Sequence, residues 1–181
     1  MEKMIRTMDG LHLWSESFGK PGDRPILLIM GAMNQGIFWP DAFCTQLASL
    51  GFYVVRYDHR DTGQSSKVDY QAQPYRLAEL TQDALAVLHA HNLPKATVVG
   101  LSMGGYIAQL LAIEHPEAVE RLVLISSSAD QRPYMAATMG QATSDFDLPP
   151  PGPALLEYIR ATIARPPRSP SGRLRVLAWR A

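Results

Sequence analysis

Residues 98–106 read VVGLSMGGY, and this stretch decides the fold of the chain. The apolar run 96–101 predicts a buried strand, and residues 103–114 predict a helix. Between them, Gly100-x-Ser102-x-Gly104 predicts a sharp strand-to-helix turn, in which the serine has a strained backbone and lifts its hydroxyl above the sheet edge. Gly100 and Gly104 are expected where neighbouring backbones pass too close for a Cβ atom. We therefore predict that Ser102 is a catalytic nucleophile.

A five-residue pattern is short, and a glycine-rich connection with a capping serine would match it equally well. The surrounding sequence favours the nucleophile. A buried strand precedes Ser102, an amphipathic helix follows it, and two further strand–helix units lie upstream. The N-terminus of the following helix would also present backbone donors beside the hydroxyl.

Working outward from this turn, strands alternate with helices. A hairpin over residues 4–17, turning at Asp9-Gly10, opens the chain. Further strands are expected at 25–30, 52–57 and 122–126, and further helices at 41–50 and 77–88, with Phe43, Leu47 and Leu50 on one stripe of the helix at 41–50. Such alternation predicts an α/β fold, with a mostly parallel sheet and helices on both faces.

The pattern changes after Asp130. Three prolines at 149–151 and two at 166–167 interrupt it, and only short helices are expected, at 154–164 and 173–180. We therefore predict a core over residues 1–130 and a partial helical lid over residues 131–181.

Acyl transfer at a serine also needs donors for the developing oxyanion. One is the backbone N–H of the residue after the nucleophile, here Met103. The other comes from the loop after an early strand, here residues 30–34, called the 30–34 loop below, and we assign Ala32 to this role. The alternative is an ordinary loop in which Gly31 makes the turn.

Taken together, these motifs resemble the α/β-hydrolase superfamily, and within it the group that includes the aclacinomycin methylesterases. The resemblance runs from about Leu13 to Asp130. Its marks are LLIMG at 27–31, FWP at 38–40, RYDHRDTG at 56–63 with Ser65, and the stretch 98–104. It implies hydrolysis of a carboxylic ester without a metal ion or organic cofactor, and a triad in the chain order serine, acid, histidine.

The later members of such a triad are not recognisable in this chain. Its five histidines are His12, His59, His89, His91 and His115, and none follows a late strand. Helix ends, where a cation is favourable, account for His89, His91 and His115 without a catalytic role. Asp130 occupies an alternative acid position. We therefore expect the hydrolase fold to be truncated after the strand at 122–126.

The charged run Asp58-His59-Arg60-Asp61 could be taken for a metal or acid–base site. Neither its spacing nor the number of Cys and His residues suits a metal ion. We expect these residues, with Gly63, to fix the geometry of their loop and to pair locally.

Composition excludes several classes of function. Lys plus Arg equals Asp plus Glu, 17 each, so the charge balance favours neither nucleic acid nor a membrane as a partner. The single cysteine, Cys44, excludes an intramolecular disulfide, and no secretory signal or membrane-spanning run is apparent, so we expect a cytoplasmic protein.

Two functions remain open from the sequence. The first is a serine hydrolase of carboxylic esters, with perhydrolysis, C–C bond hydrolysis or lactone cleavage as related chemistries. The second is a catalytically inactive scaffold that binds a partner. An open edge at the strand 122–126 also predicts self-association.

Overall fold

The computed structural model of this chain describes residues 1–141 and 152–163. It divides into two compact units, Met1–Ser127 and Ser128–Ala181. The first unit holds the sheet and the helices packed on it, and the second holds two short helices. Each unit is described by itself.

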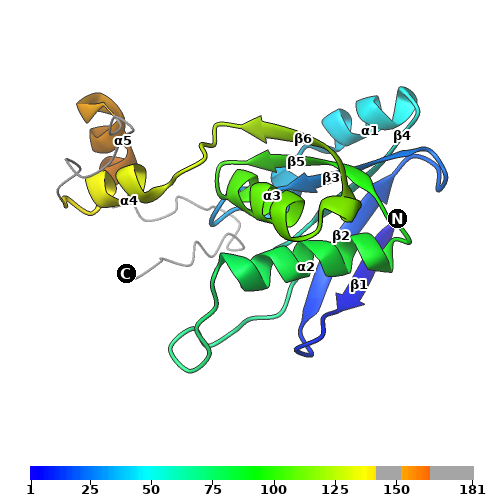
Figure 1. Ribbon diagram of the computed structural model, residues 1–181, viewed down its shortest axis with the longest axis horizontal. Helices are drawn as coiled ribbons and strands as arrows, with labels where there is room; N and C mark the ends of the chain where they lie inside the picture. The colour runs from blue at the N-terminus through cyan, green and yellow to red at the C-terminus, as the bar shows by residue number, and fades with distance from the viewer. Residues whose placement is uncertain (142–151, 164–181) are drawn as a thin grey trace, which may run out of the picture. The chain divides into compact units, whose positions relative to one another are not determined.

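A six-stranded sheet forms the centre of the first unit (Figure 1). Its order is β1-β2-β4-β3-β5-β6. The strands β4, β3, β5 and β6 are mutually parallel, whereas β2 pairs antiparallel with both β4 and β1 at one side. This arrangement confirms the predicted α/β class with a mostly parallel sheet. The bounds are β1 Glu2–Arg6, β2 His12–Phe18, β3 Arg24–Ile29, β4 Phe52–Tyr57, β5 Ala96–Leu101 and β6 Val119–Ile125.

Helices cover both faces of this sheet. The helices α2 (Leu77–Ala90) and α3 (Met103–Glu114) pack on one face, and α1 (Asp41–Ser49) packs on the other. Two single-turn 3-10 helices, η1 (Gly36–Phe38) and η2 (Pro116–Ala118), lie in the connections.

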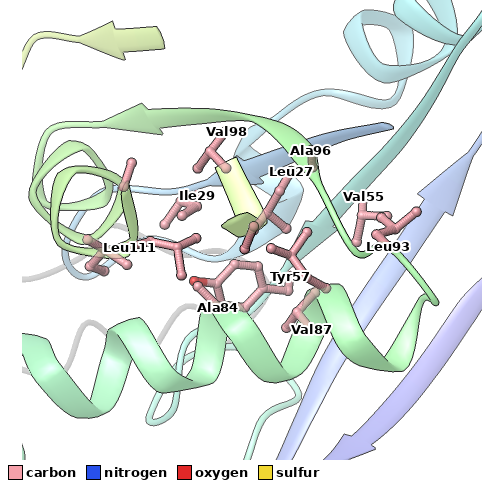
Figure 2. Packing of buried hydrophobic residues seen from close by; sticks show 14 of the residues in the cluster. Leu27, Ile29, Val55, Tyr57, Ala84, Val87, Leu93, Ala96, Val98 and Leu111 are labelled. Carbon is pink, nitrogen blue, oxygen red and sulfur yellow. The ribbon is translucent and has the colours of Figure 1, made fainter. Parts of the chain in front are cut away.

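The two faces are filled by alternate side chains of the central strands. Leu27 and Ile29 of β3 join the cluster under α2 and α3, whereas Ile26 and Leu28 face α1. All four are almost fully buried, as expected for a parallel strand covered on both sides. Figure 2 shows the larger of the two clusters, in which Tyr57 lies among side chains of α2 and α3.

The second unit contains α4 (Arg132–Thr138) and α5 (Pro153–Ile163), which contact each other. The helix predicted at 154–164 corresponds to α5, whereas α4 was not predicted. The helix predicted at 173–180 lies outside the described residues. The assignment of residues 131–181 to a lid stays a prediction.

The apolar stripe predicted for α1 is buried only in part. Cys44 is the fully buried residue of this helix, with Leu47 packed beside it. Phe43 instead stacks on Trp39, with 5.7 Å between ring centroids, and is 38% exposed. Leu50 is the C-cap residue and is largely exposed. The helix therefore contacts the sheet mainly through Cys44, with Leu47 beside it.

His91 also departs from the expectation of a charged residue at a helix end. It is the C-cap of α2 and is buried, with Nε2 2.9 Å from the Ser15 hydroxyl and Nδ1 3.1 Å from the Tyr53 hydroxyl. Burial, followed by the positive charges of Lys3 and the N-terminal amine, lowers the pKa of His91 to about 4. The histidine therefore joins α2 to the sheet as a neutral hydrogen-bonding group.

This environment predicts a loss of stability in acid. The folded pKa of about 4 lies below the unfolded value of about 6.5, so protonation favours the unfolded chain as the pH falls through this window. We expect the urea midpoint to fall more steeply between pH 6.5 and pH 4 in the parent than in His91→Gln. His89→Gln, two residues away and exposed, is the matched control and should keep the parent slope. Equal slopes in the parent and His91→Gln would contradict this account.

Among the described residues, the strand β6 forms an edge of the sheet and pairs only with β5. Four consecutive apolar residues, Leu122 to Ile125, are 37–42% exposed, although alternate residues point to opposite faces. Both faces of this strand and its outer edge are therefore accessible, which is the arrangement that favours strand-to-strand association.

We expect the purified chain to self-associate through β6, and Val123→Lys to reduce this association by placing a charge on the edge. The measurement is light scattering over a range of protein concentrations. Ile113→Lys is the control, since Ile113 is an exposed apolar residue on α3 rather than on the sheet edge. A monomeric parent, or equal effects of the two lysines, would overturn this prediction.

Candidate active site

Ser102 lies at the junction of β5 and α3, with an exposed side chain. Its backbone has φ 51° and ψ −116°, a strained conformation for a residue with a Cβ atom. Two backbone hydrogen bonds hold the turn: the Ser102 amide donates to the Ile125 carbonyl at 2.9 Å, and the Gly105 amide donates to the Ser102 carbonyl at 2.8 Å. The turn therefore holds the hydroxyl at the carboxyl edge of the parallel strands.

Gly100 and Gly104 allow this turn because backbones cross at both positions. A Cβ on Gly100 would lie 2.3 Å from the Gly104 carbonyl oxygen. A Cβ on Gly104 would lie 2.3 Å from the Ile29 oxygen and 2.7 Å from the Met30 oxygen. All these neighbours are backbone atoms, which cannot move aside as a flexible side chain would. The first turn of α3 therefore sits directly against the end of β3.

The 30–34 loop continues from the end of β3 and reaches Ser102. A Cβ on Gly31 would lie 3.3 Å from the Ser102 Cβ and 3.9 Å from its Oγ. The next residue, Ala32, is held through its carbonyl, which accepts a hydrogen bond from Asn34 Nδ2 at 3.1 Å. Met33 has φ 61°, so the loop turns tightly. Within residues 1–141 and 152–163, the amides of Ala32 and Met103 donate no recorded backbone hydrogen bond.

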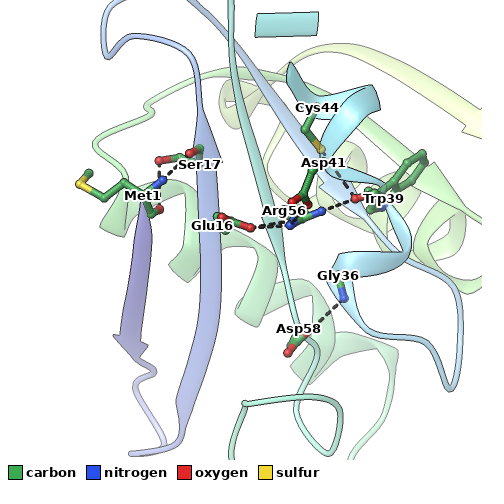
Figure 3. Close-up of polar contacts among 9 residues, drawn as sticks. All are labelled: Met1, Glu16, Ser17, Gly36, Trp39, Asp41, Cys44, Arg56 and Asp58. Atoms are coloured by element: carbon green, nitrogen blue, oxygen red, sulfur yellow. Dashed lines mark hydrogen bonds and ion pairs between the residues drawn. The ribbon is translucent and has the colours of Figure 1, made fainter. Parts of the chain in front are cut away.

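Residues at the end of β4 hold the segment that follows this loop (Figure 3). The Asp58 carboxylate accepts from the Gly36 amide at 2.7 Å and from the Gln64 amide at 2.8 Å. Arg56 donates to the Trp39 carbonyl and forms ion pairs with Glu16 and Asp41. One strand end therefore holds both ends of η1.

Two more residues of the same run extend this anchoring. His59 Nε2 lies 2.9 Å from the Met30 carbonyl oxygen at the start of the 30–34 loop. Arg60 makes a two-point contact with the buried Asp83 of α2, both bonds at 2.7 Å, and an ion pair with Asp9 at 3.1 Å.

The prediction that this run pairs locally holds in part. Asp58 accepts from the Gln64 amide and the Ser65 hydroxyl, and Asp61 accepts from the Val68 amide. The other side-chain partners of Asp58, His59 and Arg60 lie in the turn between β1 and β2, in the segment after β3, and on α2, up to 51 residues away in sequence. No local pattern marks Gly36 or Met30 as their partners, and the contacts appear only when the strands are assembled. The expected contribution of Gly63 does hold, since a Cβ there would lie 1.8 Å from an Asp58 carboxylate oxygen.

None of the five histidines forms a recorded hydrogen bond with Ser102. His59 and His91 are buried on the partners given above, and His115 contacts Gln82 and Glu117. His12 and His89 are exposed, on β2 and at the end of α2.

Asp130, the alternative acid, forms an ion pair with Arg132 at 2.6 Å. The side-chain hydrogen bond from Arg132, then its backbone bond, lower the pKa of Asp130 below its usual range.

No group of three or more His, Cys, Asp and Glu side chains among the described residues is arranged to hold a metal ion. No helix among them has the length and apolar character needed to cross a bilayer.

Comparison with known sequences matches residues 24–171 to the family described as alpha/beta hydrolase fold. The chain belongs to this family. The resemblance to the methylesterase group is confirmed as well. The chain is 46% identical over 129 residues to rhodomycin D methylesterase DauP of Streptomyces sp. (strain C5), and 39% identical over 186 residues to rhodomycin D methylesterase DnrP of Streptomyces peucetius. These matches cover 71% and 99% of this chain, and 43% and 62% of the two relatives.

Two solved structures are similar to this chain. A hydrolase from Pseudomonas aeruginosa PA01 superimposes with a TM-score of 0.65 at 34% identity, over 76% of this chain and 52% of that one. Est816, an N-acyl homoserine lactone degrading enzyme, has a TM-score of 0.65 at 28% identity, over 89% of this chain and 55% of that one. The chain thus spans about half the length of the relatives that it matches.

The close approach of Gly104 to the end of β3 predicts how a substitution there changes the free energy of unfolding. In an ordinary helix, Gly→Ala stabilises by about 1 kcal/mol. At Gly104 the added Cβ would meet two backbone oxygens, so we expect Gly104→Ala to lower the free energy of unfolding by about 2 kcal/mol or more. The measurement is urea denaturation. Gly152→Ala, where a Cβ meets nothing within 4 Å, is the control and should stay within about 0.5 kcal/mol of the parent. An unchanged midpoint for Gly104→Ala would refute the close approach.

Proposed function

We propose that this alpha/beta hydrolase acts on carboxylic esters with Ser102 as its nucleophile. The observation that carries the proposal is the strained, exposed Ser102 at the junction of β5 and α3, with the 30–34 loop in contact with it. Names of the relatives support the substrate class, since two of them are rhodomycin D methylesterases. No metal ion or organic cofactor is needed for this chemistry.

The proposed reaction has two steps. Ser102 Oγ attacks the ester carbonyl carbon, the C–O bond to the alcohol breaks, and the alcohol leaves with a proton. Water then attacks the acyl-enzyme, releases the carboxylic acid and returns the proton to Ser102. During both steps the carbonyl oxygen carries negative charge. We assign the stabilisation of this charge to hydrogen bonds from the amides of Ala32 and Met103. Both amides are without a recorded backbone acceptor among the described residues, as such a role requires.

A general base must accept the Ser102 proton, and none of the five histidines hydrogen-bonds to it. We therefore propose that the late acid and histidine of the triad are not in this chain. The same observation supports the second candidate function, a catalytically inactive scaffold that binds a partner. The two candidates differ in whether Ser102 can be acylated at all.

The experiment is acylation by p-nitrophenyl acetate, followed by intact mass and peptide mapping. Free imidazole is added as an external base, because unassisted serine is a weak nucleophile at neutral pH. We expect a slow acetyl adduct on Ser102, accelerated by imidazole and absent in Ser102→Ala. With a complete triad, loss of the serine costs about 10⁴-fold or more in rate.

Ser126→Ala is the matched control. Ser126 is also an exposed serine at a strand end with positive φ, 48°, but it follows β6 rather than β5. Its substitution should leave the adduct unchanged. If Ser102 is not acylated with or without imidazole, the scaffold function replaces the esterase.

A further inference from the structure

We propose that His59 is a positioning residue for the proposed oxyanion site. The hydrogen bond that His59 Nε2 donates to the Met30 carbonyl holds the 30–34 loop against Ser102. The inference rests on the proposed function and deepens it. Three observations carry it: the hydrogen bond, the crowding around the Met30 carbonyl, and the separate anchoring of the segment beyond the loop.

The Met30 carbonyl oxygen is held between two elements. His59 Nε2 lies 2.9 Å away, and the backbone of Gly104 in α3 packs so closely that a Cβ there would come within 2.7 Å. A carbonyl oxygen can only accept, so His59 donates from Nε2. This contact fixes the plane of the Met30–Gly31 peptide at the point where the chain leaves β3.

Gly31 makes such an anchor necessary. Its two backbone dihedrals are the freest of any residue type, and they alone relate the Met30–Gly31 peptide to the following peptide, which carries the Ala32 N–H. The close approach of Gly31 to Ser102 requires a glycine or a slightly displaced neighbour, so a stiffer residue is not an easy substitute. The direction of the Ala32 amide therefore depends on contacts that hold the loop from outside.

The segment beyond the loop is held separately. Asp58, the residue before His59, accepts from the Gly36 amide at 2.7 Å, and Asn34 Nδ2 donates to the Ala32 carbonyl at 3.1 Å. His59 and Asp58 thus hold the two sides of one turn from adjacent positions after β4. Removal of the His59 donor would free the start of the 30–34 loop, which touches Ser102, and would leave the segment at Gly36 held by Asp58.

The surroundings of His59 favour a neutral donor rather than a general base. The side chain is 2% exposed, and its ring packs edge-on against Tyr57 at 5.2 Å between centroids. Burial lowers the pKa of His59 below its usual range. The other ring nitrogen, Nδ1, is buried and has no hydrogen-bond partner in the described part of the chain. The ring therefore has one N–H at neutral pH, on Nε2, and the Met30 carbonyl oxygen accepts a hydrogen bond from it.

The first test measures binding of phenylboronic acid, which forms a bond from boron to Ser102 Oγ, releases the hydroxyl proton to solvent and leaves a tetrahedral anion in place of the oxyanion. Equilibrium binding does not depend on a general base. We compare the full chain with His59→Leu, which removes the donor, and His59→Gln, whose amide can donate from the position of Nε2. We expect the dissociation constant to rise about tenfold or more in His59→Leu and to stay within about threefold of the parent in His59→Gln.

His91→Gln is the matched control, since it alters another buried, hydrogen-bonded histidine that does not contact the loop. It should lose stability without a change in boronate affinity. Equal boronate affinity in the parent and His59→Leu would overturn the proposal. Ser102→Ala separates the two claims, because it should abolish binding if Ser102 is the nucleophile, whatever His59 does.

The second test needs no ligand. Backbone amide relaxation in ¹⁵N-labelled protein reports the order of Gly31 and Ala32, with order parameters of about 0.85 for rigid backbone and below about 0.6 for flexible segments. We expect the order parameters of these two amides to fall in His59→Leu, while Gly36 keeps its parent value. His59→Gln and His91→Gln should resemble the parent. Rigid Gly31 and Ala32 in a folded His59→Leu would contradict the proposal even if no boronate binds.

Discussion

The close approach of α3 to the end of β3 is the constraint on which the rest of the site depends. Gly104 lies against the carbonyls of Ile29 and Met30 at a distance that no side chain would allow. Because the helix starts so near the strand, the connection from β5 has no room for a loop. Ser102 must make the whole reversal by itself, with φ 51°. The same approach brings the 30–34 loop to the serine, so one packing contact produces both the strained residue and its neighbour.

Residues at the end of β4 also hold the segments around the site in place. Its last two residues, Arg56 and Tyr57, point to opposite sides of the sheet, and residues 58–60 continue into the loop. On the α1 side, Arg56 forms ion pairs with Glu16 and Asp41 and donates to Trp39 (Figure 3). Beyond the strand, Asp58 and His59 hold the turn after β3, and Arg60 is fixed by Asp83. Of these groups, His59 acts on the carbonyl next to Gly31, which approaches Ser102, and none of them forms a hydrogen bond with Ser102.

Local pattern was sufficient for most of the sheet. The bounds of β4, β5 and α3 coincide with the predicted ranges, because long apolar runs and helical spacing reflect burial on both faces. The strand-to-helix turn at Ser102 could also be predicted, since the glycine spacing reports a backbone requirement within five residues. By contrast, η1 and α4 carry no comparable signal, and the buried residue of α1 depended on how closely that helix meets the sheet.

The pairing of residues 58–60 could not be predicted for a different physical reason. A carboxylate or imidazole has many possible partners, and the selection is made by strand order, which brings β4 beside β3 and β2. His91 illustrates the same point. Its position at the end of α2 suggested a charged residue, yet the helix end is buried against Ser15 and Tyr53, and burial favours the neutral ring.

The central claim is that Ser102 and the 30–34 loop together form the reactive site. A crystal structure of the chain with phenylboronate bound tests it most directly. The account predicts a bond from boron to Ser102 Oγ, with one boronate oxygen about 2.7–3.1 Å from the backbone nitrogens of both Ala32 and Met103. A boronate bound elsewhere, or an adduct on Ser102 whose oxygens face solvent more than about 3.5 Å from both nitrogens, would contradict it.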